Sequence, residues 1–140
     1  MHGREEKEAF AGLDCQRLPL ETTDCLCRLI VLGMLPALQE RDLDAFGEAL
    51  YDFNLRAGQA FATVQEGPYA SSRVADLVTF IRRQGFRGVG QSSWGPAVFA
   101  VADESARAAD LARRIREHVG LRASEVLVTP ACNHGAAVDV

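Results

Sequence analysis

The sequence has 140 residues, enough for one domain that buries about two thirds of the surface of its unfolded chain. Its 15 basic and 19 acidic residues leave a formal net charge of -4, which argues against general binding to nucleic acid or to an anionic membrane. The charged start lacks the apolar core of a signal peptide, and no apolar run approaches the ~18 residues of a membrane span, so we expect a cytoplasmic protein.

The chain is expected to begin with an arm and a first helix. Residues 1–21 are polar and then mixed, with no sustained hydrophobic period, which predicts an N-terminal arm or interdomain linker before a domain at 22–140. Asp24 is placed to cap a helix that runs to about residue 39. Pro36 lacks a backbone donor and is expected to kink or shorten its last turns. The apolar positions of this helix are Leu26, Ile30, Met34 and Leu38.

Two further helices are predicted on either side of a break at 65–69. Asp42 is placed to cap the second helix, and Ser71 or Ser72 the third, which Gly85 ends in a left-handed conformation. The second helix is marked by apolar residues spaced three or four positions apart, namely Leu43, Phe46, Leu50, Phe53, Ala57 and Phe61. The third helix is expected to turn inward Val74, Leu77, Val78 and Ile81.

The second half of the chain combines strands with one more helix. Residues 86–89 and 97–102 are predicted as strands on either side of a loop, and 125–129 and 136–140 as strands on either side of a turn at 130–135. Asp103 is placed to cap a fourth helix that Gly120 ends. Its inward positions are Ala108, Leu111, Ala112, Ile115 and Val119, and its outer, solvated face carries Arg107, Arg113, Arg114 and Arg116.

This order of elements predicts an α+β sandwich, in which an antiparallel sheet has helices on one face. A parallel doubly wound fold is disfavoured, because the strands do not alternate regularly with helices.

The loop between the first two strands is the main candidate for chemistry. Gly88, Gly90 and Gly95 permit positive φ and close approach of a ligand, while Ser92 and Ser93 add hydroxyl donors to a row of backbone N–H groups. Such a loop suits a phosphate or a carboxylate. Its spacing is not a dinucleotide fingerprint, because it leads into a strand, and it lacks the lysine of a Walker A loop. A glycine-rich hairpin with Trp94 as a core filler is the alternative, and composition leaves both open.

Other polar residues give weaker signals. Cys25 and Cys27 lie about 200° apart around a helix, so they do not share a metal ion while helical. Cys132 and His134 are two ligand types without a second pair, so we expect reduced thiols and no metal site. Arg87, just before the loop, could assist anion binding, although an arginine near a helix end usually serves solvent and the helix dipole.

One stretch resembles a known family motif, and it reads Gly88-Val89-Gly90-Gln91-Ser92-Ser93-Trp94-Gly95-Pro96, followed by Val98-Phe99. It is similar to the third conserved motif of the GHMP kinase superfamily, in the version carried by β-ribofuranosylaminobenzene 5′-phosphate synthases. Similarity in order and spacing extends over nearly the whole chain. The further matching segments are Leu35-Pro36-Ala37-Leu38, residues 42–47, Gly58-Gln59-Ala60-Phe61, residues 65–69 and Asn133-His134-Gly135.

The resemblance implies a C-terminal domain of the ferredoxin-like α+β type, whose loop faces a phosphate-binding loop on a separate N-terminal domain. Synthases of this branch condense 4-aminobenzoate with phosphoribosyl pyrophosphate, losing carbon dioxide and pyrophosphate, on the route to tetrahydromethanopterin. By position, Trp94 would stack on or wall off the aromatic ring. The resemblance names no catalytic residue, and the candidates for binding the phosphorylated substrate are Tyr69, Arg87, Gly88, Gly90, Gln91, Ser92, Ser93 and Gly95.

The chain departs from the family in one respect. It contains no Pro-x-x-x-Gly-Leu-Gly-Ser-like phosphate loop, so we expect a C-terminal piece that is inactive without its N-terminal domain. No cofactor follows from the residues, although Mg²⁺ could accompany the phosphorylated substrate in the full-length protein. Two alternatives stay open: a fragment of an ATP-dependent small-molecule kinase of the superfamily, and a non-catalytic binding module that forms homodimers or associates with the N-terminal domain.

Overall fold

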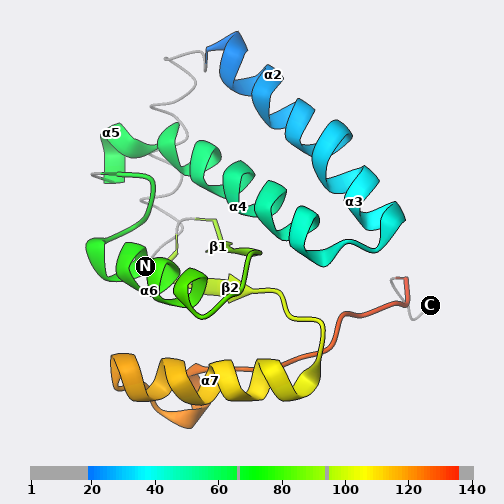
Figure 1. Ribbon diagram of the computed structural model, residues 1–140. Coiled ribbons are helices and arrows are strands. Elements are labelled where there is room, and N and C mark those ends of the chain that lie inside the picture. The colour runs from blue at the N-terminus through cyan, green and yellow to red at the C-terminus, as the bar shows by residue number, and fades with distance from the viewer. Residues whose placement is uncertain (1–18, 66, 94, 136–140) are drawn as a thin grey trace, which may run out of the picture. The chain divides into compact units, whose positions relative to one another are not determined.

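The computed structural model describes residues 19–65, 67–93 and 95–135 (Figure 1). Trp94, most of the predicted arm and the predicted strand at 136–140 lie outside the described residues. The chain forms two compact units that meet in the sequence between Val101 and Ala102.

The first unit opens with a long helical segment made of α2 (Leu20–Arg28), the π-helical η1 (Leu29–Met34) and α3 (Leu35–Glu40). It begins four residues before Asp24, so the predicted cap is wrong. Pro19 precedes the first turn instead, and its carbonyl accepts a hydrogen bond from Thr22 N at 2.8 Å. The irregularity expected at Pro36 takes the form of the wider π turn ahead of it. A π turn shifts the backbone bonding register where proline has no N–H to donate, and the helix continues to Glu40.

Helix α4 (Leu43–Gln59) is the central element of this unit. Asp42 caps it as predicted, because its Oδ1 accepts from Ala45 N at 2.9 Å. One side of α4 packs against the helical segment 20–40 and another against strand β1 (Val89–Gln91). A Cβ added at Gly47 would lie 2.5 Å from the backbone nitrogen of Gly88, so only glycine allows this approach. The helix ends at Gln59, before Phe61, and the short α5 (Ala62–Gln65) follows a turn.

Helix α6 (Ser72–Arg83) confirms the third predicted helix. Ser71 is its N-cap, with Val74 N donating to Ser71 Oγ at 3.3 Å, and Gly85 follows its end with φ of +88°. Its buried residues are Val74, Val78 and Ile81, three of the four predicted to face inward. The helix packs against both strands of the sheet.

The sheet of the described residues is an antiparallel pair of β1 with β2 (Val98–Ala100), in which Gly90 lies opposite Phe99. The predicted hairpin is therefore confirmed, although β1 begins later than residue 86. Two further backbone bonds extend the ladder, from Val101 N to Gly88 O and from Ser92 N to Ala97 O. Val89 is completely buried, since α4 and α6 both pack on β1. Helices with an antiparallel sheet confirm the α+β class.

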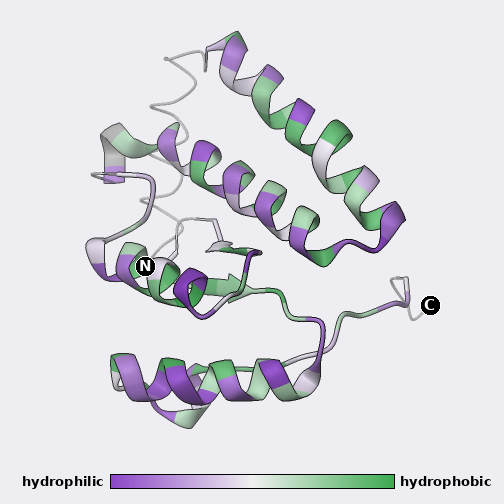
Figure 2. Cartoon of the chain, in the orientation of Figure 1, coloured by the Kyte–Doolittle hydropathy of each residue, from purple (hydrophilic) through white to green (hydrophobic). Residues whose placement is uncertain are grey.

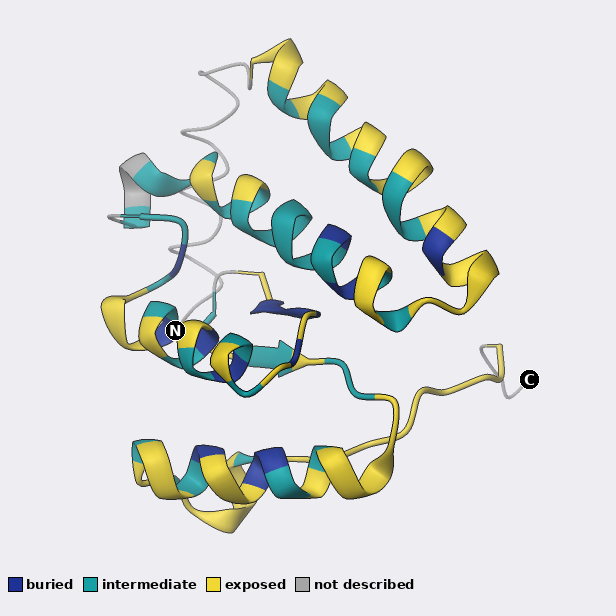
Figure 3. Cartoon of the chain, viewed as in Figure 1, coloured by how far each residue is buried: buried dark blue, intermediate teal, exposed yellow. Residues whose placement is uncertain are grey.

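The segment 20–40 leaves apolar side chains uncovered in this chain. Figure 3 shows the exposed residues of this segment on the side turned away from α4, and Figure 2 shows apolar residues along the same segment. Besides Leu20 at its start, four large apolar residues of the segment are more than half exposed, namely Val31, Leu32, Leu35 and Leu38. This surface is called the outer face of segment 20–40 below.

The second unit contains α7 (Ser105–Val119) and the short 3-10 helix η2 (Ala123–Glu125). Glu104 precedes α7 without a side-chain cap, so the predicted cap at Asp103 is wrong. Asp103 pairs instead with Arg107 at 2.8 Å. Gly120 ends the helix at φ of +73°, as predicted. The buried residues of α7 are Leu111, Ala112 and Ile115.

The strand predicted at 125–129 does not form. Glu125 belongs to η2, where its carboxylate accepts from Arg122 N at 2.7 Å, while Leu127 and Val128 are exposed. The apolar run favours extended backbone, but a strand also needs a neighbour for its N–H and C=O groups, and no described strand pairs with it. No helix of the described segments has the length and apolar character needed to span a membrane.

Candidate phosphate-binding loop

In the loop between β1 and β2, two of the described residues have a left-handed conformation. Ser92 and Ser93 are exposed at its start, and Ser93 has a φ of +48° although it is not glycine. Gly95 has a φ of +67°, and its N–H donates to Ser92 O at 2.8 Å. The peptide bond between Gly95 and Pro96 is cis. The turn therefore holds two adjacent serines at the surface.

Three backbone amides of the predicted anion-binding row donate hydrogen bonds within the protein. Ser92 N donates to Ala97 O at 2.9 Å, and Gly95 N to Ser92 O. Gln91 N donates to Asn54 Oδ1 at 2.8 Å. These three donors are committed within the protein. A phosphate at this loop would therefore depend on the exposed serine side chains rather than on these amides.

Gln91 is directed into the protein. It is only 6% exposed, and its side-chain oxygen accepts a hydrogen bond from Ala70 N at 2.6 Å. Its side-chain nitrogen donates to Ser93 O at 2.9 Å. Gln91 therefore braces the serine turn against the segment that follows Gly67, instead of presenting its amide to solvent.

Asn54 of α4 completes this arrangement and was not predicted from the sequence. Its Nδ2 donates to Gln91 O and its Oδ1 accepts from Gln91 N, both at 2.8 Å. A Cβ added at Gly90 would lie 2.5 Å from Asn54 Oδ1, so the glycine before Gln91 leaves room for the amide. The available signal is a polar, weakly helix-forming residue between Leu50 and Ala57 in the apolar stripe of α4.

Arg87 lies near the loop, but its charge is already paired. Its Nη1 lies 2.9 Å from Glu48 Oε1, and Arg82 Nη2 lies 2.9 Å from Glu48 Oε2. Arg82 also stacks 4.0 Å from the ring centroid of Tyr51 and donates to Arg87 O. Burial would raise the pKa of Glu48, but the bonds and charges of Arg82 and then Arg87 lower the pKa overall. An anion at Arg87 would have to compete with this carboxylate.

Tyr69 is an interior residue. It is 8% exposed, and its hydroxyl has no hydrogen-bond partner of normal geometry among the described residues. The pKa of Tyr69 is raised to about 12, mainly because burial disfavours the charged form and, to a lesser extent, because of the electrostatic effect of nearby Tyr51. Residues 67–69 pass close to α4. The backbone of Pro68 occupies the space that a Cβ on Gly58 would need, so glycine at 58 allows this approach.

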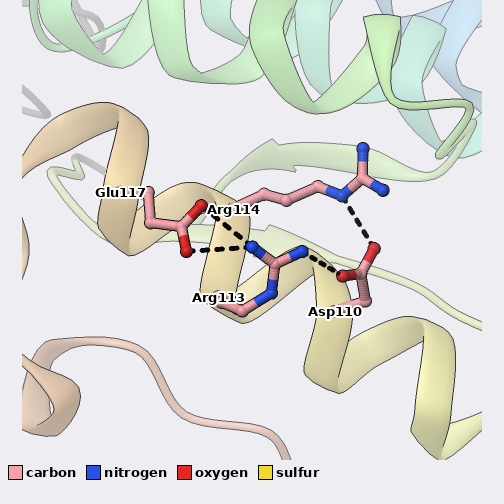
Figure 4. A network of polar contacts seen from close by, with 4 residues as sticks. All are labelled: Asp110, Arg113, Arg114 and Glu117. Carbon is pink, nitrogen blue, oxygen red and sulfur yellow. Dashed lines mark hydrogen bonds and ion pairs between the residues drawn. The ribbon is translucent and has the colours of Figure 1, made fainter.

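The remaining candidates from the sequence are the cysteines and the arginines of α7. No group of three potential metal ligands occurs among the described residues, and Cys132 Sγ lies 3.6 Å from the carbonyl oxygen of His134. On α7, acidic neighbours pair with the arginines (Figure 4). Arg113 bonds both Asp110 and Glu117, and Arg114 bonds Asp110. This face is a mixed, solvated surface, unlike the basic stripe that nucleic acid attracts.

The comparisons with known proteins identify the family. The family model of the GHMP kinase C-terminal domain matches residues 34–120, which include α4, α6, both strands and the serine turn. The chain belongs to this family. The resemblance predicted from residues 88–99 is thereby confirmed.

Three curated relatives carry the same name, beta-ribofuranosylphenol 5'-phosphate synthase. The protein from Methanothermobacter thermautotrophicus is 31% identical over 134 residues, covering 96% of this chain and 38% of the relative. The protein from Archaeoglobus fulgidus is 34% identical over 125 residues, covering 88% and 36% respectively. The protein from Methanocaldococcus jannaschii is 30% identical over 135 residues, covering 96% and 38%. The chain thus spans less than two fifths of the length of these relatives. No solved structure matches it.

The buried hydroxyl of Tyr69 generates a prediction about alkaline stability. The folded-state pKa of about 12 exceeds the ordinary tyrosine pKa of 10.0, so the stabilisation is complete below about pH 10 and is lost as pH rises toward 12. Tyr69→Phe removes this ionisation without removing a described hydrogen bond. We expect the variant to unfold at a higher pH than the parent chain, with a free energy of unfolding within about 1 kcal/mol of it at neutral pH.

The measurement is urea unfolding at a series of pH values. Tyr51→Phe is the matched control, because it keeps the ring beneath Arg82 and the hydroxyl of Tyr69 and should retain most of the alkaline loss. A neutral-pH loss of more than about 2 kcal/mol in Tyr69→Phe would show that the hydroxyl makes a stabilising hydrogen bond, and would contradict its description as a buried group without a partner of normal geometry.

Proposed function

We propose that this chain is the C-terminal, substrate-binding part of a synthase that joins phosphoribosyl pyrophosphate to an aromatic acid. The single observation that carries the proposal is the exposed Ser92-Ser93 turn, which lies within a region similar to three synthases and is fixed from inside by Gln91. Membership of the GHMP kinase C-terminal family supports a phosphorylated substrate. We further propose that the complete domain is a ferredoxin-like sandwich, to which the described strand pair contributes.

In the proposed reaction, the aromatic acid displaces pyrophosphate from phosphoribosyl pyrophosphate and loses carbon dioxide. The hydroxyls of Ser92 and Ser93 would donate hydrogen bonds to phosphate oxygens, which are strong acceptors. Trp94, outside the described residues, would contact the aromatic ring. Mg²⁺ would neutralise part of the pyrophosphate charge in the full-length protein. Such phosphorylated metabolites are consistent with a cytoplasmic enzyme.

Two different names bear on the identity of the aromatic substrate. The resemblance to aminobenzene synthases suggests 4-aminobenzoate, whereas the relatives are named for a phenol product. A phenol product would arise if the acid carried a hydroxyl group in place of the amine. We propose a para-substituted benzoate as the substrate class, with 4-aminobenzoate and 4-hydroxybenzoate as the two compounds to compare.

The remaining wall of the site would come from a longer polypeptide. The relatives are more than twice as long as the stretch that matches this chain. We propose that an N-terminal domain supplies the phosphate loop, and that this chain alone does not turn over substrate.

A chimera tests this proposal. The matching C-terminal segment of the Methanothermobacter protein is replaced by this chain, and pyrophosphate release is measured with phosphoribosyl pyrophosphate and each benzoate. We expect turnover, and a loss of about tenfold or more in kcat/KM for phosphoribosyl pyrophosphate when Ser92 and Ser93 are both changed to Ala. Gln59→Ala, an exposed change at the end of α4, is the control that should leave the rate unchanged.

A folded chimera with no turnover on either benzoate would contradict the synthase assignment. Calorimetric titration of the same chimera with ATP and with phosphoribosyl pyrophosphate separates the synthase from the kinase alternative. Binding of ATP alone would favour phosphoryl transfer, which most members of the superfamily perform.

The outer face of segment 20–40 favours a second, non-catalytic role as a homodimer contact. Exposed apolar residues along one helix face are typical of protein interfaces. Antiparallel packing on a second copy would oppose the two helix dipoles and bury the exposed apolar side chains of one copy against those of the other. We therefore propose that a second copy of this chain packs on the outer face of segment 20–40.

Light scattering of the chain across concentrations tests the dimer. Leu35→Glu places a charge on the outer face and should give a monomer. Gln59→Glu adds the same charge at an exposed position at the end of α4, away from this face, and should remain a dimer. A parent chain that stays monomeric at high concentration would contradict the arrangement.

A further inference from the structure

The conformation of Ser93 is unusual for its residue type. Its φ of +48° lies in the left-handed region, which residues with a side chain adopt uncommonly and mostly where the surroundings enforce it. Ser93 is also exposed, so burial of its side chain does not impose this geometry. A hydrogen bond to its backbone would help to hold it.

Gln91 supplies such a contact. Its buried side-chain amide donates to Ser93 O at 2.9 Å, while its oxygen accepts from Ala70 N at 2.6 Å. Both ends of one side chain are thus used, one on the serine turn and one on the segment after Gly67. The second bond fixes the orientation of the amide, since the oxygen must face Ala70 and the nitrogen must face Ser93.

Asn54 fixes the backbone from which this side chain extends. β2 pairs with one edge of β1, and Asn54 binds both the N–H and the carbonyl of Gln91 at 2.8 Å. The Cα of Gln91 is therefore held by α4, and its side chain by Ala70. A rigid base of this kind allows Gln91 to impose a conformation on the next turn.

We propose that Gln91 and Asn54 are positioning residues that hold Ser93 in the left-handed conformation and thereby set the positions of the Ser92 and Ser93 hydroxyls for a phosphate group. The phosphate ligand in this inference rests on the proposed function, whereas the holding of Ser93 by Gln91 and Asn54 does not. Gln91 acts through Ser93 and touches no substrate. It also links the serine turn mechanically to the segment that carries Tyr69.

The test combines a structural and a binding readout by NMR on this chain. A left-handed residue gives a strong nuclear Overhauser effect between its own amide and α protons, which reports φ at Ser93 directly. Titration with pyrophosphate, followed at the amides of Ser92 and Ser93, reports binding. Gln91→Met keeps the approximate shape of the side chain and removes both hydrogen bonds. We expect it to lose the strong intraresidue effect and to weaken pyrophosphate binding about tenfold.

Gln91→Glu provides a sharper variant. A carboxylate can still accept from Ala70 N but cannot donate to Ser93 O, so the turn should lose its left-handed residue at about pH 7. A buried carboxyl group has a raised pKa, and its protonated form can donate. Lowering the pH to about 5 should then restore the strong effect at Ser93, which a general loss of stability would not do.

A destabilising change away from the turn is the control. Ala37→Gly weakens α3 through helix propensity and should leave both the effect at Ser93 and pyrophosphate binding unchanged while the chain stays folded. Retention of the left-handed Ser93 and of full affinity in Gln91→Met would overturn the proposal. If the parent chain shows no pyrophosphate response but Gln91→Met still releases Ser93, the positioning role holds and the proposed ligand fails. Should Gln91→Met not fold, the pH response of Gln91→Glu decides.

Discussion

The paired hydrogen bonds between the side-chain amide of Asn54 and the backbone of Gln91 are the constraint on which the first unit depends. β1 has three residues and pairs with the equally short β2. So short a hairpin has little stability of its own. The amide of Asn54 acts on Gln91 as a neighbouring strand would, satisfying one donor and one acceptor. It thereby ties the hairpin to the longest helix of the described residues.

The glycines around this contact are explained by the close approach of α4 to the backbone of β1. Gly47 lets α4 approach the backbone at Gly88, and Gly90 leaves room for the amide of Asn54. The same closeness turns Gln91 inward, where it reaches both Ala70 and Ser93. The motif that resembles a phosphate loop thus contains two kinds of residue. Its glycines and glutamine build the turn, and its serines are left at the surface, where a ligand would meet them.

Features that depend on neighbouring residues could be predicted from the sequence. Features that depend on contacts between distant segments could not. The caps at Asp42 and Ser71 and the left-handed glycines at 85 and 120 depend on one turn of chain, and all four are confirmed. Asp24 and Asp103 have the same residue type, but the helices begin elsewhere, because Pro19 opens one and an ion pair occupies Asp103. The apolar run at 126–128 lacks a described strand to pair with. Nothing local marks Asn54 or Gln91 as partners, because 37 residues separate them.

Amide hydrogen exchange at Gln91, compared between the parent chain and Asn54→Ala, tests the central constraint most directly. Loss of the asparagine leaves the partly buried N–H and carbonyl of Gln91 without their partner, which costs about 1–3 kcal/mol of unfolding free energy. We expect exchange of the Gln91 amide to accelerate about tenfold or more, while Gln59→Ala leaves it unchanged. Equal protection of Gln91 in the parent chain and in Asn54→Ala, with equal stability, would contradict the central role of this contact.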